Sequence, residues 1–84
     1  MTHEEKVEHA AQMLQMHNSL AQSIQCLAAG RETPEMPQFM EWENLSEVEK
    51  NYVRAIADSM IIALEDPSKD MRMIALDVMK ARNI

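Results

Sequence analysis

The sequence predicts an all-α fold, a small bundle of three main helices with an acidic, proline-containing connector, forming one domain over residues 1–84. Three stretches repeat apolar residues at steps of three and four, which is the period of a helix face. Two capping-box spacings and the only glycine mark helix ends. The strict alternation of apolar and polar residues that marks a half-buried strand is rare in this sequence, so no strand is expected. We expect the helices at about residues 2–29, 46–65 and 67–82.

The first helix is expected to begin with a capping box and to end at the glycine. Thr2 and Glu5 have the spacing at which each side chain accepts from the other residue's backbone N–H group. Gly30 follows the last apolar residue, where a left-handed C-terminal cap favours glycine. The expected core face comprises Val7, Ala10, Leu14, His17, Ala21, Ile24 and Ala28. His17 is therefore expected in the core or in an interface, where it would act as a hydrogen-bonded imidazole or as a pH-sensitive switch.

Residues 30–45 form the connector and cannot continue the helix, because Pro34 and Pro37 each remove a backbone donor. Apolar side chains in this stretch predict that it packs against the bundle. The negative charge also gathers here. Residues 31–50 hold six Glu and two basic residues, a balance of −4, whereas residues 51–84 hold five basic and five acidic residues.

The second helix is expected from Ser46, which forms a capping box with Glu49, to about Glu65. Its expected core face comprises Val48, Tyr52, Val53, Ile56, Ala57, Met60, Ala63 and Leu64. Asp66 and Pro67 suit the N-cap and the first position of a third helix. That helix is expected to bury Met71, Ile74, Ala75, Val78 and Ala81.

The helices carry more apolar residues than one subunit of this size buries. Ile61 and Ile62 are adjacent, and successive helical positions point about 100° apart, so both cannot face one partner helix. Met73 and Leu76 lie off the core face of the last helix. Surplus apolar surface of this kind is commonly covered by self-association. We expect a homo-oligomer, a dimer or larger; the alternative is a compact monomer whose long side chains wrap its edges.

Composition narrows the function classes. The chain has 84 residues, 46% of them hydrophobic, which argues against a disordered chain, and its single cysteine allows no internal disulfide. A net charge of −6 argues against direct nucleic-acid binding, since the phosphate backbone favours clustered positive charge. No apolar run approaches the roughly 18 to 20 residues of a membrane span, and the acidic N-terminus lacks signal-peptide features. We expect a soluble, cytoplasmic protein in which Cys26 is a small buried hydrophobe.

The residues do not indicate catalytic chemistry. One glycine allows neither a phosphate-binding loop nor a dinucleotide fingerprint, and one cysteine with three histidines forms no nucleophile–base motif. We therefore expect a protein without enzyme activity, with no catalytic residue, no cofactor and no metal site.

The connector carries the main candidate binding surface. Phe39, Met40 and Trp42 stand among Glu41 and Glu43. Aromatic side chains dominate the energetics of interfaces, and acidic side chains steer basic partners. We expect these five residues to bind a macromolecular partner, with Trp42 as the apolar anchor. Two alternatives stay open: the segment closes one end of the bundle as a lid, or its acidity only keeps the protein soluble.

A small-ligand module that binds a nucleotide is the alternative function. Lys50 and Arg54 stand four residues apart on one helix face, a spacing suited to neutralising phosphates. Either Tyr52 or Trp42 would supply the aromatic ring on which a base stacks. The cavity would lie at an oligomer interface. Glu47 and Asp58 flank the two basic residues as candidate salt-bridge partners.

The stretch from Trp42 to Tyr52 resembles the W-x-x-L-s-x-x-E-K/R pattern that opens a helix in RyR-repeat-like modules, and similar stretches occur in short bacteriophage and prophage proteins. The resemblance runs through Ala57 at most, about a quarter of the chain. The upstream helix and the second half of the full module have no counterpart, so no ligand-binding residue is implied. What the resemblance implies is a setting: a small phage-type accessory protein that acts in the host cytoplasm on a host protein.

Overall fold

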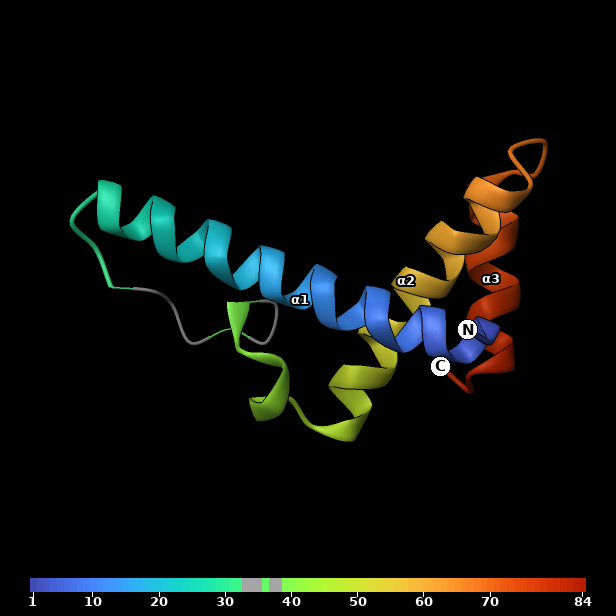
Figure 1. The fold of residues 1–84 in the computed structure, drawn as a ribbon, viewed down its shortest axis with the longest axis horizontal. Helices are drawn as coiled ribbons and strands as arrows, with labels where there is room; N and C mark the ends of the chain where they lie inside the picture. The colour runs from blue at the N-terminus through green and yellow to red at the C-terminus, as the bar shows by residue number, and fades with distance from the viewer. Residues whose placement is uncertain (33–35, 37–38) are drawn as a thin grey trace.

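The computed structural model describes residues 1–32, 36 and 39–84. Its elements are α1 (His3–Ala28), the short 3₁₀ helix η2 (Trp42–Asn44), α2 (Glu47–Glu65) and α3 (Met71–Ala81), and the described residues form no strand (Figure 1). The predicted all-α class with three main helices is confirmed. Pro34 and Pro37, on which the prediction of a helix-breaking connector rests, lie outside the described residues.

Both ends of α1 form as the sequence predicts. The Glu5 N–H donates to Thr2 Oγ1 at 3.2 Å, and the Thr2 N–H donates to Glu5 Oε1 at 3.1 Å. At the other end the Arg31 N–H donates to Cys26 O at 2.8 Å. This bond spans the left-handed residue of a Schellman motif, and that residue is Gly30 with φ +67°.

Gly30→Ala is expected to lower the free energy of unfolding by about 1 kcal/mol, because the left-handed conformation costs an L residue roughly 1–2 kcal/mol. A Cβ atom at Gly30 would meet no atom within 4 Å, so steric contact adds nothing to this cost. The matched control is Asn83→Gly, at the end of α3, where φ is +58°; this variant is expected to be more stable. Urea unfolding measures both shifts, and a stabilising Gly30→Ala would contradict the assignment.

The capping box that opens α2 also forms. The Glu49 N–H donates to Ser46 Oγ, and the Ser46 N–H donates to Glu49 Oε1, both at 3.2 Å. Leu45, which precedes the cap, is buried. The two helix starts that were predicted from a capping box are therefore confirmed.

The third helix begins four residues later than predicted, at Met71. The Asp66 carboxylate accepts from the Ser68 hydroxyl at 2.6 Å, so Asp66 opens a turn instead of a helix. Asp70 is the N-cap, and its carboxylate accepts from the Arg72 N–H at 2.8 Å. A serine two residues after an aspartate offers a local hydrogen bond that competes with a helix start. The Asp-Pro pair was therefore the wrong place for the cap.

The three helices do not close around one another. α2 packs on the N-terminal half of α1 and α3 packs on α2, while the last turns of α1 extend beyond both (Figure 1). η2 lies beside the middle of α1. The molecule measures 43 × 26 × 24 Å with a radius of gyration of 14.4 Å, whereas a compact domain of this length has about 12 Å.

The core is small for the apolar content of the chain. Its main cluster joins Ala55 of α2 to Ile74 and Val78 of α3, with Ile62 and Ala63 packed at its edge. Ile74 and Val78 fall on the predicted core face of the third helix, whereas Met71 and Ala81 of that face are exposed. Cys26 is buried, as expected, and Gln22 Nε2 lies 3.3 Å from its sulfur.

Much of the predicted core on α1 and α2 is wrong. On α1, His17 and Ile24 are exposed, whereas the polar side chain of Gln15 is 1% exposed. The side chains that α2 leaves exposed include most of its expected core face: Val48, Tyr52, Ile56, Met60 and Leu64. Both helices turn a partly polar face inward, because charged and amide side chains there make contacts between elements. An apolar stripe at helical spacing marks a buried face only when something packs on it.

No helix in the described part of the chain is long and apolar enough to cross a membrane.

Candidate functional site

A groove runs along α1 where η2 lies beside it. Its volume is about 670 Å³. The α1 side presents residues at steps of three and four: His9, Gln12, Met13, Met16, Ser19, Leu20 and Ser23. Glu41, Trp42 and Glu43 form the other side. Three of the five residues predicted to bind a partner therefore lie together in this groove.

The groove combines apolar and polar side chains and is acidic at one edge. Met13, Met16 and Leu20 are each more than half exposed, so their side chains are open to a ligand. Among the described lining residues, the carboxylates are those of Glu41 and Glu43, and none is a lysine or an arginine. Flexible methionine side chains conform to varied apolar surfaces. The groove therefore favours a ligand that is both apolar and positively charged.

Two cations from α2 hold the Trp42 ring. Lys50 Nζ lies 5.6 Å and Arg54 Cζ lies 5.4 Å from the ring centroid, both within cation–π range. The Leu45 N–H donates to Trp42 O at 3.1 Å and closes the single turn of η2. Because Leu45 is itself buried, the half-buried indole is fixed from both its backbone and its ring.

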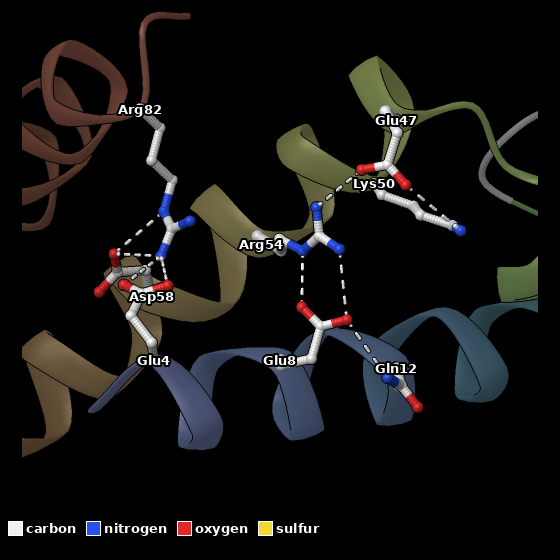
Figure 2. Close-up of polar contacts among 8 residues, drawn as sticks. All are labelled: Glu4, Glu8, Gln12, Glu47, Lys50, Arg54, Asp58 and Arg82. Atoms are coloured by element: carbon white, nitrogen blue, oxygen red, sulfur yellow. Dashed lines mark hydrogen bonds and ion pairs between the residues drawn. The ribbon is translucent and has the colours of Figure 1, made fainter. Parts of the chain in front are cut away.

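Arg54 is also paired with two carboxylates (Figure 2). Its Nε and Nη2 donate to Glu8 at 2.6 and 3.3 Å, a bidentate contact, and Nη1 donates to Glu47 Oε2 at 3.4 Å. Lys50 Nζ lies 3.7 Å from Glu47 Oε1. The hydrogen bonds from Arg54 lower the pKa of Glu8, and the same contact raises the pKa of Arg54. Glu47 thus has the salt-bridge role that the sequence suggested.

The three predicted ligand residues do not gather in one site. Tyr52 is exposed and lines a shallow depression of about 330 Å³ together with Arg54 and Glu47. Lys50 is not among the described lining residues of that depression and lies at Trp42 instead. A phosphate entering the depression would meet the Glu47 carboxylate beside an arginine that is already neutralised.

Phe39 and Met40 are half-buried and do not belong to the described lining of the groove. The Met40 carbonyl accepts from Gln15 Nε2 at 2.6 Å, which ties the end of the connector to α1. These two predicted partner-binding residues therefore lie outside the described lining of the groove, and their partial burial agrees with the expectation that this part of the connector packs down.

A second polar network joins both ends of the chain to α2 (Figure 2). Arg82 Nε and Nη2 donate to Asp58 Oδ2 at 3.2 and 3.0 Å, and Nη2 also donates to Glu4 Oε1 at 3.0 Å. His3 Nε2 lies 2.7 Å from Asp58 Oδ1. Asp58, a candidate partner of Arg54, thus pairs with Arg82 instead. His3, Glu4 and Asp58 are close enough to share a cation, but the guanidinium group already lies against both carboxylates.

Sequence reasoning missed the α1 side of the groove. Met13 and Leu20 were not among the candidate binding residues, yet both lie in the groove. A usable signal exists, because Met13, Met16, Leu20 and Leu27 repeat at steps of three, four and seven along one side of the helix. The network of Arg82 has no such signal, since Glu4 is 78 residues away in the chain.

The chain matches no protein-family model, no curated protein and no solved structure.

Proposed function

We propose that this chain is a non-enzymatic interaction protein that binds a basic, apolar segment of a macromolecular partner in the groove between α1 and η2. The observation that supports the proposal most is the chemistry of that groove. Exposed methionine and leucine side chains of α1 lie across from Trp42, and Glu41 and Glu43 flank the indole. An aromatic anchor within an acidic edge recognises an apolar side chain that has lysine or arginine neighbours.

An amphipathic helix is the partner segment that fits best. The groove follows α1 from His9 to Ser23, which is about 21 Å at 1.5 Å per residue. A helix of about four turns has this length, and a helix laid in a groove reads its target through apolar side chains at steps of three and four. The net charge of −6 would draw a basic helix toward the chain before contact.

The phage-type setting implied by the resemblance makes a host protein the expected partner. A basic face that normally binds nucleic acid has the required charge, and this chain would compete for it without binding nucleic acid itself. We also propose that the protein works as a homo-oligomer, because the lone chain leaves apolar faces of α1 and α2 exposed.

Nucleotide binding has less support. Arg54 is held by Glu8 and Glu47, and Lys50 is shared between Glu47 and Trp42. A phosphate group would have to displace these contacts, and it would lie close to carboxylates that repel it.

Charge reversal at the edge of the groove tests the proposal. Glu41→Lys combined with Glu43→Lys is expected to weaken binding of a synthetic Leu/Lys amphipathic helix by at least about tenfold, roughly 1.4 kcal/mol, because attraction becomes repulsion. Trp42 is the single tryptophan of the chain, so its fluorescence reports binding at the groove directly.

The matched control is Glu32→Lys combined with Glu65→Lys, which changes the net charge equally at exposed carboxylates outside the described lining of the groove. Binding by this control is expected to fall by less than about threefold at moderate salt, since distant charges are screened. Equal losses in the two double variants would mean that net charge alone attracts the helix. Affinity capture from host lysate with both variants would then identify the natural partner.

A further inference from the structure

α2 turns two charged side chains inward, beside the apolar residues that pack on α3, and leaves a row of large side chains exposed. The side chains of Arg54 and Asp58 point into the molecule and pair with α1 and with the C-terminal end of the chain. On the opposite side lie five large side chains that are between 47% and 81% exposed: Val48, Tyr52, Ile56, Met60 and Leu64. Each is four residues from the next, so the set drifts by about 40° per step and spans about 160° of the helix surface. These five side chains form the α2 outer face.

The accessible surface of the chain is larger than one folded subunit needs. The chain exposes 6142 Å², whereas a folded monomer of 9.6 kDa exposes roughly 5,100 Å² by the usual size scaling. The excess is about 1,000 Å², and a standard protein–protein interface buries about 800 Å² on each partner. The surplus is therefore comparable in size to one additional interface per chain.

Charge indicates that the partner at this face is a second copy. Two copies that each carry −6 repel one another, so self-association needs a face that brings few carboxylates together. Within the arc of the α2 outer face the charged residue is Glu49, and one of its oxygens is used in the capping box. A symmetric dimer formed through the groove on α1 would instead bring Glu41 and Glu43 of the two copies close together, and these carboxylates would repel.

We infer that the α2 outer face is the interface of a two-fold symmetric homodimer centred on Ile56. A two-fold axis makes the same patch meet itself, and Ile56 is the midpoint of the set. An antiparallel pair of α2 helices then brings Ile56 against its own copy, with Tyr52 and Met60 on either side of it and Val48 and Leu64 at the margins. The contact would run about 6 Å on either side of the axis, the distance from Ile56 to Tyr52 and to Met60 along the helix. The inference rests on the self-association part of the proposed function, and it is independent of what binds in the groove.

Ile56→Glu tests the inference through the molar mass, measured by light scattering after size-exclusion chromatography. Two glutamates would face each other across the axis in an apolar contact, and the dimer dissociation constant is expected to rise at least about 100-fold. The matched control is Ile24→Glu on α1, because Ile24 is 59% exposed and Ile56 is 53% exposed. Both positions are exposed in helices, so circular dichroism is expected to show equal helix content.

The unmodified chain and Ile24→Glu are expected to elute as dimers, and Ile56→Glu as a monomer. A dimer of Ile56→Glu, or a monomer of Ile24→Glu, would place the interface elsewhere and overturn the inference. Helix binding measured by Trp42 fluorescence in Ile56→Glu separates the two proposals: binding that persists in a monomer supports the groove independently of the dimer.

Crosslinking gives a second readout that does not depend on breaking the interface. Ile56→Cys in a Cys26→Ser chain is expected to form a disulfide between copies when oxidised glutathione is added, since residues at a two-fold axis approach within disulfide range. Ile24→Cys in the same background is expected to stay uncrosslinked on that timescale. Faster crosslinking through position 24 would contradict the assignment of the face.

Discussion

Asp58→Ala is expected to lower the free energy of unfolding by about 3 kcal/mol, because it removes the main partner of an arginine that is largely withdrawn from water. The side chains of Asp58 and Arg82 are each 12% exposed, and two hydrogen bonds join them. Without Asp58, the guanidinium group keeps only the exposed carboxylate of Glu4 among its described ion-pair partners. The network holds the start of α1 and the end of the chain to α2. Its loss would therefore weaken the packing of both segments on α2.

The matched control is Asp77→Ala, an exposed aspartate on α3, which is expected to change stability by less than about 0.5 kcal/mol. Replacing both partners, with Asp58→Leu and Arg82→Met, is expected to recover part of the loss because neither variant side chain is charged. All four proteins are compared by urea unfolding at one concentration, since self-association shifts apparent stability. If Asp58→Ala lowers the free energy of unfolding by less than about 1 kcal/mol, the network contributes little to the stability of the fold.

Arg54→Ala is expected to destabilise the protein by about 2 kcal/mol. The variant loses the bidentate contact with Glu8, the contact with Glu47 and the cation–π contact with Trp42 together. Arg54→Lys keeps the charge but not the planar fork, so it is expected to recover less than half of the loss. The emission of Trp42 should also shift, because one of the two cations over its ring is gone; an unchanged spectrum would contradict the contact.

The Glu8 contact also predicts a pH dependence. Arg54 lowers the pKa of Glu8 in the folded chain below 4.5, its ordinary value. A depressed folded pKa stabilises the protein fully above the unfolded value, and the gain is lost as pH falls through the folded value. Unfolding free energy is therefore expected to fall less steeply with acidification in Glu8→Gln than in the unmodified chain. Parallel acid profiles would contradict this role.

The helix ends were predictable because the residues that determine them are neighbours in sequence. The hydroxyl of Thr2 and the carboxylate of Glu5 meet across three residues, as do those of Ser46 and Glu49. Gly30 likewise needs only its local backbone to serve as a cap. The start of α3 was misplaced because Ser68 competes for Asp66, a choice between two local hydrogen bonds that spacing alone does not decide.

The packing was less predictable because apolar periodicity does not say which partner covers a face. Ile56 lies on a clear helical stripe and is exposed, whereas Arg54 and Asp58 lie on the inward side. Pairs such as Glu8 with Arg54 join residues 46 positions apart, and no local pattern encodes them. The groove was only half predictable for the same reason. Trp42 and its acidic neighbours are adjacent in sequence and were recognisable, but no local pattern shows that α1 forms the opposite side.

Sedimentation equilibrium of the unmodified chain is the most direct test of the central claim, that this fold turns polar side chains inward and leaves an apolar face for another molecule to cover. The chain has a mass of 9.6 kDa, so a dimer has twice that, 19.2 kDa. The account predicts the dimer mass from low micromolar concentration upward at physiological salt. A mass of 9.6 kDa that stays constant as concentration rises would mean that the chain is a stable monomer with the α2 outer face uncovered. That result would contradict the central claim.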